Sequence, residues 1–471
     1  MLLRLWFVRH LALIAGDGLV YGDIAKNLLQ HHIFGFTEPG LMPGSIEIRP
    51  TLIRLPGYPL FLAVCFRVFG LQNFTAVLYM QVAADLLTCL LAAALAMHLF
   101  GDRAALVALW LAALCPFTAS YTAQPLTETL VLTTIAATLY TFARWQSAGR
   151  AYNHWLWIAA IPLASSILLR PEQVLFAAST FAAMLWTSLR HRPTTQLRIQ
   201  TARPVFAAAL CVLLPLIPWT IRNERTFHVF QPLAPRYAND PGELAPLGFA
   251  RWYRTWAIDF ADTENVYWNY PGAPIELGDI PPRAFSAGSP SASQRLRTRT
   301  AQVLADYNAT GADSSEVIPA IDARFAALAA ERIRAHPLLY YFVLPVSRVL
   351  DMVLRPRTEM MPVSLDWWAW TSHRAQTIFA AAYASLNFAY LAFAGAGFIA
   401  WKRRRWQHTI QPLPSNSREL AIAMAAAILL RAALLLTIDN SEPRYTLEFF
   451  PILFVCASAL FATHPAQRAG R

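Results

Sequence analysis

Acidic and basic side chains form five short motifs that are far apart along the chain but each lie at the border of an apolar run. A carboxylate can accept a proton as a general base, and a guanidinium group can bind an oxyanion through two parallel hydrogen bonds. For any one motif alone, a solvated helix end is the better interpretation, and five together favour a shared site. The motifs are Asp17 to Asp23, Glu128 in LTETL, Arg170-Pro171-Glu172, Arg222-Asn223-Glu224, and Glu442-Pro443-Arg444-Tyr445.

The elements that position these motifs are apolar helices. The chain has 471 residues, of which 56% are hydrophobic and only 14% are charged, and its mean hydropathy is +0.37. Soluble domains carry about 25% charged residues. Apolar runs near the length of about 20 residues that a helix needs to cross a bilayer recur along the sequence. The composition therefore predicts an all-α integral membrane protein with about ten transmembrane helices.

The predicted spans lie in two groups. The first apolar segment, 2–15, is short for a full span, and segment 340–354 is interrupted by polar residues and is placed at the membrane interface. Residues 1–229 form an N-terminal transmembrane region, 230–337 an extracytoplasmic loop region and 338–471 a C-terminal transmembrane region. We expect 284–293 to be a flexible linker and 325–336 to be a helix that packs on the membrane domain. The remaining runs are 79–100, 106–121, 126–143, 155–169, 174–189, 205–221, 375–401, 420–438 and 449–462.

Arginine in the short loops predicts the orientation. With a cytoplasmic N-terminus, the short inside loops carry most of the arginine, which is the positive-inside pattern. The loop 16–59 and region 230–337 then lie outside, and all five polar motifs fall at the outer face. The residues that support this orientation are Arg103, Arg144, Arg150, Arg190, Arg192, Arg198, Arg203, Lys402, Arg403, Arg404, Arg405, Arg468 and Arg471.

The remaining composition excludes several other classes of protein. The formal net charge is +11, but no basic patch with interleaved aromatic residues predicts nucleic-acid binding. The five cysteines are odd in number and lie mostly in apolar runs, which indicates core residues and no disulfide framework. His31 and His32 are adjacent and cannot face one ion from a helix, and no His/Cys cluster has ligand spacing, so no metal site is predicted.

The polar motifs, taken in order, resemble those of a known enzyme class. GDGLVYGDIAKNLL followed by RLPGYPLFLA is similar to the first outer loop of glycosyltransferase family 39 and 83 membrane enzymes. LTETL, LLRPE, PWTIRN and EPRYTLEFFP then follow in the order seen in that class. The resemblance implies a GT-C bundle, like that of protein mannosyltransferases and aminoarabinose transferases, whose first outer loop carries short amphipathic helices.

This resemblance implies an inverting transfer of a sugar from a polyprenyl-phosphate donor, of the undecaprenyl-phosphate type, to a hydroxyl-bearing acceptor. The acceptor is a glycan, a lipid or a protein, and the implied location is the bacterial plasma membrane with the site facing outside. No cofactor is required, and a divalent cation near Asp17 is left open. The alternative from another class is a transporter or flippase of lipid-linked saccharides, although the sequence shows no inverted repeat of the kind that transporters carry.

Asp17 is the implied general base, since an acidic residue after the first span has this role in the family. From the residues alone, Asp17 as the N-cap of a helix beginning at Gly18 is the favoured alternative. Asp23 lies about 240° further round a helix, so the two carboxylates do not share a face. We therefore expect Asp23 and Tyr21 to support the site from behind.

The implied contacts to donor phosphate and sugar are Arg54, Arg222, Arg444, Tyr445 and Glu128, with Arg170, Glu172 and Glu442 supporting them. A snorkelling interface arginine is an equal alternative for Arg54, as is a helix cap for Glu128. Val20 stands where relatives that transfer aminoarabinose have an arginine, so one phosphate contact of that subgroup is absent.

Two charges lie inside predicted spans, Asp85 in 79–100 and Arg431 in 420–438. An unpaired charge at the centre of a span costs roughly 2.5–3.5 kcal/mol. We hypothesise that the two side chains pair or line an interior cavity.

Overall fold

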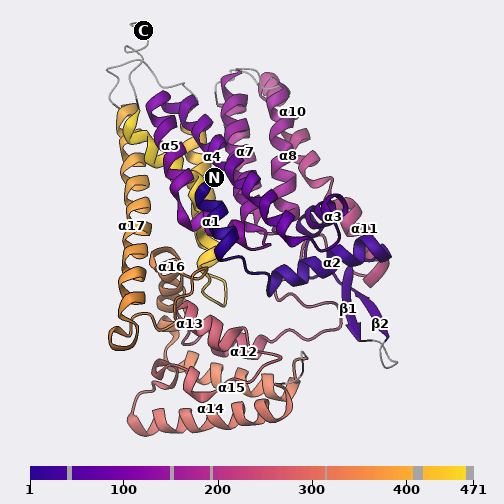
Figure 1. The fold of residues 1–471 in the computed structure, drawn as a ribbon, viewed down its shortest axis with the longest axis vertical. Helices are drawn as coiled ribbons and strands as arrows, with labels where there is room; N and C mark the ends of the chain where they lie inside the picture. The colour runs from indigo at the N-terminus through magenta and orange to yellow at the C-terminus, as the bar shows by residue number, and fades with distance from the viewer. Residues whose placement is uncertain are drawn as a thin grey trace. The chain divides into compact units, whose positions relative to one another are not determined.

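The computed structural model describes residues 1–39, 45–148, 153–190, 195–312, 314, 316–406 and 417–462. The chain folds into two compact units, each made of segments that are distant in sequence (Figure 1). The first unit comprises 1–235, 388–431 and 447–471, and the second comprises 236–387 and 432–446. Arg150, Arg192, Arg468 and Arg471, which entered the orientation argument, lie outside the described residues.

The first unit is built mainly of helices, and its apolar runs form them because leucine and alanine favour helix. Helix α4 packs against both α5 and α7, and α7 packs against α8. Their axes run along the long dimension of the drawing in Figure 1. The helices are α1 (Leu2–His10), α2 (Asp17–His31), α3 (Gly57–Phe69), α4 (Phe74–Phe100), α5 (Asp102–Leu114), α6 (Pro116–Ser120), α7 (Glu128–Ser147), α8 (His154–Leu169), α9 (Gln173–Leu189), α10 (Thr195–Leu213), α11 (Leu216–Phe227) and α19 (Phe450–Ser458).

Local sequence explains where these helices begin and turn. The side chain of Asn73 accepts a hydrogen bond from the backbone N–H of Ala76 and caps α4. Gly101 joins α4 to α5 with a φ of 92°, a conformation that glycine adopts without a steric penalty. Two helices, α17 (Trp370–Trp406) and α18 (Ser417–Leu435), supply residues to both units.

The multi-pass membrane character predicted from composition is confirmed. Four helical segments among the described residues are long and apolar enough to cross a bilayer, or six if two bent pairs each count as one span. The run 106–121 bends by 46° between α5 and α6, where Pro116 begins the second helix. The apolar helices α3, α8 and α9 have only 13, 16 and 17 residues. These three helices are therefore not counted among the candidate spans because they are short, and not because they are polar.

The two charges inside predicted spans do not pair with each other, because each has a partner elsewhere. Arg4 Nε lies 2.6 Å from Asp85 Oδ2, and both side chains are fully buried. Arg4 also donates to the carbonyl oxygens of Ala112 and Ala113, so its guanidinium ties α1 to α4 and to the end of α5. Arg431 forms ion pairs near the candidate site described below.

The first loop contains a β-hairpin that the sequence prediction missed. Strands β1 (Gly35–Pro39) and β2 (Ile46–Pro50) pair antiparallel, with Gly35 opposite Pro50 (Figure 1). The alternation of apolar and polar residues in IEIRP fits a strand, whereas an all-helical loop was expected. A Cβ at Gly35 would lie 2.3 Å from the Arg49 carbonyl oxygen, so only glycine fits this close pairing. Helix α2 ahead of the hairpin agrees with the expected loop helix.

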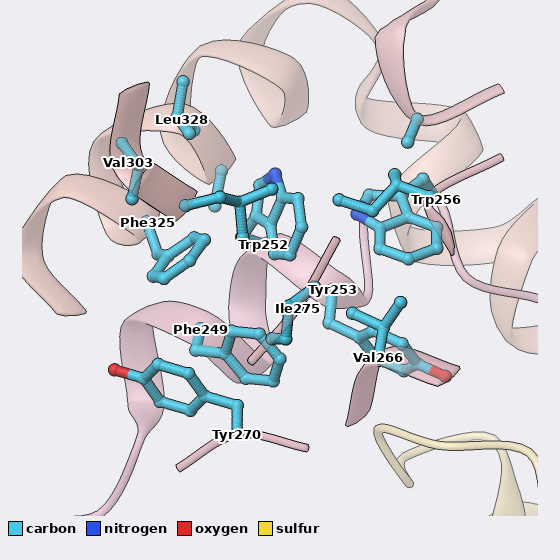
Figure 2. Close-up of a cluster of buried hydrophobic side chains, with 14 of the residues drawn as sticks. Phe249, Trp252, Tyr253, Trp256, Val266, Tyr270, Ile275, Val303, Phe325 and Leu328 are labelled. Atoms are coloured by element: carbon cyan, nitrogen blue, oxygen red, sulfur yellow. The ribbon is translucent and has the colours of Figure 1, made fainter. Parts of the chain in front are cut away.

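The second unit has an aromatic core of its own. Phe249, Trp252, Tyr253 and Trp256 project from α12 (Leu247–Tyr253) and the turn after it, and Phe325 of α15 packs edge-on against Phe249 (Figure 2). Phe249 and Tyr270 stack with ring centroids 4.1 Å apart. The other helices are α13 (Phe260–Asp262), α14 (Pro290–Thr310), α15 (Pro319–Ala335) and α16 (Leu344–Leu354).

Two expectations about this unit are revised. The segment 284–293 is not a free linker, because Ser289 caps α14 by accepting a hydrogen bond from Ala292 N–H. The predicted helix 325–336 exists as part of α15, and it packs on α12 of its own unit. Asp322 fixes that contact by accepting hydrogen bonds from the N–H groups of Gly248 and Phe249, each at 2.8 Å.

Removal of one partner from the Arg4–Asp85 pair should destabilise the first unit strongly. In Asp85→Ala the Arg4 guanidinium stays buried without its counter-ion, so we expect a loss of about 3–5 kcal/mol in the free energy of unfolding. The thermal unfolding midpoint of the purified chain in detergent measures the effect. The double substitution Arg4→Met with Asp85→Leu should recover most of the loss, and an unchanged midpoint in Asp85→Ala would contradict the assignment.

Candidate active site

The predicted base Asp17 forms an ion pair with the predicted phosphate ligand Arg54. Asp17 Oδ1 lies 2.7 Å from Arg54 Nη2, and the side chains are 27% and 25% exposed. Helix α2 begins at Asp17 itself and its N-cap is Gly16, so Asp17 does not cap a helix that starts at Gly18. The pair thus lies in the first unit at an accessible helix start, where the helix dipole favours a carboxylate.

Close backbone packing positions both members of this pair. A Cβ on Gly18 would lie 2.6 Å from a ring carbon of Pro125, so the start of α2 sits directly on the segment before α7. In the same way, a Cβ on Gly57 at the start of α3 would lie 2.6 Å from the carbonyl group of Leu168. The two glycines therefore allow α2 and α3 to approach α7 and α8 more closely than larger residues would.

Tyr21 lies one turn after Asp17 and packs edge-on against Tyr58, with ring centroids 5.0 Å apart. The Arg54 guanidinium lies 5.7 Å from the Tyr21 ring centroid. Tyr58 donates to Gln81 Oε1 at 2.6 Å, and Gln81 Nε2 donates to the Gln124 carbonyl at 2.6 Å. Burial raises the pKa of Tyr21 to about 12, with nearby Asp17 and Glu128 acting in the same direction. Its hydroxyl therefore remains protonated at neutral pH and can donate a hydrogen bond.

Asp23 faces a different set of partners from Asp17, as the helical spacing predicts. Its carboxylate accepts hydrogen bonds from Lys26 Nζ at 2.6 Å and from the Thr37 backbone N–H at 2.7 Å. Partial burial on its own favours the neutral acid, but these hydrogen bonds lower the pKa of Asp23. Asp23 thus anchors β1 to α2 and holds the first loop in shape.

Arg222 is the second anchor of this loop. Its guanidinium donates to the carbonyl oxygens of Thr51 and Phe34, each at 2.7 Å, and it lies over the Trp219 ring. The same region contains a small core in which Val20 packs with Ile24 and Leu52. Arg222 therefore connects α11 to both ends of the β-hairpin. The phosphate contact proposed for it from the sequence remains a prediction.

Behind Tyr21, five charged side chains form a buried network within the first unit. Arg170 lies 3.2 Å from Glu128 and 2.8 Å from Glu172. Arg431 lies 3.1 Å from Glu172 and 3.2 Å from Glu448. The network combines two cations with three carboxylates, and the exposed fraction of each side chain is 16% or less.

A small cavity adjoins this network. Its volume is about 20 Å³, which is room for about one water molecule. Charged groups form one side of the cavity and aliphatic or aromatic side chains form the rest. The lining residues are Ile135, Glu172, Gln173, Leu175, Phe176, Ala427, Ile428, Arg431, Glu448, Phe449 and Ile452. Arg431 thus both pairs with carboxylates and lines a cavity, as hypothesised for it.

The C-terminal motif, Glu442-Pro443-Arg444-Tyr445, lies in the second unit. Tyr445 donates its hydroxyl to Glu442 Oε1 at 2.8 Å, and Arg444 forms an ion pair with Glu442. Arg357 donates to the Pro443 carbonyl and to the Thr446 hydroxyl, and so holds the turn that carries the motif. The three predicted residues therefore form one polar group that is fixed by a buried arginine.

Sequence reasoning missed three residues that complete these networks. Glu448 stands in the apolar run LEFFP, Arg4 in the short first segment, and Arg357 between the predicted segments 340–354 and 375–401. A charge within an apolar run was a usable signal, and it was applied to Asp85 and Arg431 but not to Glu448 or Arg4. Arg357 carried no such signal, because its position in the buried turn depends on tertiary packing.

The stability of the first unit should fall at acidic pH through Glu172. Although burial alone favours the neutral acid, Arg170 and Arg431 hold the pKa of Glu172 at about 2, below its ordinary value of 4.5. The contribution of Glu172 is therefore complete above pH 4.5 and is lost as pH falls toward 2. We expect the unfolding midpoint of the chain to drop across this window, and the drop should be smaller in Glu172→Gln. Glu38→Gln, which changes an exposed ion pair, is the control, and equal drops in both variants would refute the role of Glu172.

Comparison with known proteins gives a family match and several distant structural likenesses. The family model described as dolichyl-phosphate-mannose-protein mannosyltransferase matches residues 50–219. An oligosaccharyltransferase from Archaeoglobus fulgidus, tethered with an acceptor peptide containing the NVT sequon, is 12% identical with a TM-score of 0.47. That match covers 94% of this chain and 44% of the oligosaccharyltransferase, so this chain spans less than half of its length.

ArnT from Cupriavidus metallidurans bound to undecaprenyl phosphate is also similar, at 12% identity and a TM-score of 0.38. The match covers 98% of this chain and 76% of ArnT. No curated protein matches the chain in sequence.

The segment matched by the family model contains part of the candidate site. It begins at the end of β2 and ends in α11, and it includes Arg54, Glu128, Arg170 and Glu172. Asp17, Arg222 and the C-terminal motif lie outside it. The resemblance inferred from the ordered motifs is confirmed over this segment. Residues 50–219 of the chain are thus similar to the family described as dolichyl-phosphate-mannose-protein mannosyltransferase.

Proposed function

We propose that the chain is an inverting glycosyltransferase that moves a sugar from a polyprenyl-phosphate donor to a hydroxyl-bearing acceptor. The observation that carries the proposal is the Asp17–Arg54 ion pair, which joins a proton acceptor and a phosphate-binding group at 2.7 Å in an accessible position. The family match over residues 50–219 supports the same class of reaction. The arginine-rich inside loops support a site at the outer face of a bacterial plasma membrane.

In the proposed reaction, the acceptor oxygen attacks the anomeric carbon from the side opposite the phosphate. A new carbon–oxygen bond forms, the bond to the phosphate oxygen breaks, and the phosphate leaves with the electron pair, so the anomeric centre inverts. Asp17 takes the proton of the acceptor hydroxyl. Arg54 offsets the charge that develops on the leaving phosphate. No cofactor is required for this sequence of events.

The ion pair also supplies a coupling between donor binding and base activation. Without a donor, the Arg54 guanidinium is shared with the Asp17 carboxylate. A donor phosphate competes for that guanidinium, because arginine binds phosphate oxygens through two parallel hydrogen bonds. Asp17 then loses its counter-ion and becomes the better proton acceptor. Tyr21, whose hydroxyl stays protonated, is placed beside both groups to donate a hydrogen bond.

The buried network supports this site from behind. Arg170 and Glu128 lie close enough to Tyr21 to interact with it electrostatically. Arg431 and Glu448 hold the other end of the network. Because each charge has partners, the network resists rearrangement while the exposed pair changes partners. We assign Glu128, Arg170 and Glu172 to positioning, with Glu128 the member nearest to a bound sugar.

Substitution of Asp17 tests the proposal directly. The purified chain is supplied with undecaprenyl-phosphate sugars and candidate acceptors, and new glycosidic bonds are measured. We expect Asp17→Asn to lower the transfer rate by about 10²-fold or more, since this is the range for loss of a general base. Glu47→Gln, an exposed carboxylate of β2 in the same loop, is the matched control and should retain the full rate. Undiminished transfer by Asp17→Asn would refute the assignment.

Substitution of Arg54 separates phosphate binding from proton transfer. We expect Arg54→Gln to raise the KM for the donor by about tenfold, and Arg54→Lys to recover part of the loss because it restores the charge without the planar fork. Transfer kinetics at varied donor concentration measure both effects. A KM that stays unchanged in Arg54→Gln would exclude a donor contact.

The second candidate is a flippase of lipid-linked saccharides, favoured only by the apolar helices that surround the polar groups. The same preparation distinguishes the two functions. Movement of the labelled lipid between leaflets without new glycosidic bonds, unaffected by Asp17→Asn, would support the flippase.

A further inference from the structure

Two arginines of the second unit lie within 4 Å of the Asp439 carboxylate, and a third arginine lies near them. Arg254 Nη1 lies 3.4 Å from Asp439 Oδ1, and Arg236 Nη2 lies 3.7 Å from the same oxygen. Arg348 lies close enough to interact electrostatically with both Asp439 and Arg254. Three cations and one anion leave an excess of two positive charges. The nearby carboxylate of Glu442 does not offset this excess, because it forms its own ion pair with Arg444.

Arg348 is buried and only partly satisfied. Its side chain is 1% exposed, and its Nη1 donates to the carbonyl oxygens of Arg254 and Ala257 at 3.3 and 3.1 Å. Its Nε and Nη2 have no hydrogen-bond partner among the residues that the structure describes. Burial of a cation with unsatisfied donors is costly and calls for a physical explanation, and a bound anion is one that also supplies the missing charge.

Asp439 is a poor match for the arginines around it. Although Asp439 Oδ1 has two guanidinium groups within 4 Å, it accepts a hydrogen bond from neither within the described part of the chain. Burial raises the pKa of Asp439 even against three neighbouring arginines. One carboxylate therefore neither neutralises the cluster nor uses its donors.

The cluster is also reachable from one side. Arg236 is 54% exposed and Arg254 is 24% exposed, whereas Asp439 is 5% exposed. The three arginines thus form a path of increasing burial from Arg236 through Arg254 to Arg348. An anion that enters at Arg236 would meet successively less hydrated donors, which strengthens charge-assisted hydrogen bonds.

We propose that Arg236, Arg254 and Arg348 bind a phosphate-class oxyanion, and that Asp439 is an internal anion that competes with it. A tetrahedral phosphate presents oxygens in several directions, whereas a carboxylate presents two in one plane. Its charge of about −2 near neutral pH matches the excess of the cluster. The site lies wholly within the second unit and does not rest on the proposed sugar transfer. The phosphate belongs either to a lipid headgroup or to a free anion, and the chemistry of recognition is the same.

The test uses the full chain in nanodiscs of phosphatidylcholine, titrated with inorganic phosphate by isothermal calorimetry at constant ionic strength. We expect saturable binding that weakens about tenfold in Arg254→Gln and less in the exposed variant Arg236→Gln. Arg251→Gln, which removes an exposed arginine of α12 three residues before Arg254, should bind as the unaltered chain does. Absence of saturable binding, or equal weakening in Arg251→Gln and Arg254→Gln, would overturn the proposal.

The substitution Asp439→Asn should change the affinity for phosphate in the opposite direction to the arginine substitutions. Removal of a competing anion should tighten phosphate binding severalfold, even if the variant is less stable. If Asp439 served only to hold the arginines in place, the same substitution would weaken binding, and the proposal would fail. The unfolding midpoint, measured with and without phosphate, confirms that each variant is folded.

The source of the phosphate is distinguished in a second arm. Nanodiscs that contain phosphatidic acid are titrated with inorganic phosphate under the same conditions. Weaker apparent binding than in phosphatidylcholine alone supports a lipid phosphate as the ligand. Unchanged binding supports a free phosphate anion.

Discussion

A charged side chain within an apolar helix bundle is stable only beside an opposite charge, and the first unit is organised by this constraint. Arg4 lies in α1 and its partner Asp85 in α4. Arg431 in α18 forms ion pairs with Glu172, which directly precedes α9, and with Glu448, which lies two residues before α19. These pairs join residues that are far apart in sequence. Hydrophobic packing alone is compatible with several arrangements of the helices. Paired charges favour one arrangement, because any arrangement that separates a pair leaves a buried charge without its partner.

The proposed site combines an adaptable part with a fixed part. Asp17 and Arg54 are each about a quarter exposed and can exchange partners with a ligand. The network of Arg170, Glu128 and Glu172 behind them is buried and multiply paired. A transferase needs this division, because the reacting groups must change hydrogen bonds during the reaction while their frame keeps its geometry.

Sequence patterns could predict the elements whose signal is local. The apolar runs predicted most helices of the first unit, and the ordered motifs predicted the family resemblance. The helical spacing of Asp17 and Asp23 correctly predicted separate partners. The β-hairpin and the helix cap at Ser289 were missed because weak local preferences were read as loop or linker. The partners of Asp85 and Arg431 could not be predicted, since they depend on which helices meet.

The lengths of the apolar helices were also difficult to predict from the sequence. The predicted apolar runs 155–169 and 174–189 are present as α8 and α9, but the length of these helices is set by the turn at Arg170 and Pro171 between them, whose effect depends on packing. The predicted site residues likewise divided between the two units. Glu442, Arg444 and Tyr445 form a group of their own that Arg357 holds in the second unit.

The anchoring of the first loop by Arg222 has a consequence for biosynthesis. The bonds from Arg222 to Thr51 and Phe34 close sequence separations of 171 and 188 residues. A chain made from its N-terminus has already produced Asp17 and Arg54 when these anchors are still missing. The first loop can therefore reach its final form only after α11 has been synthesised. The geometry of the proposed site is therefore completed long after its two reacting side chains have been made.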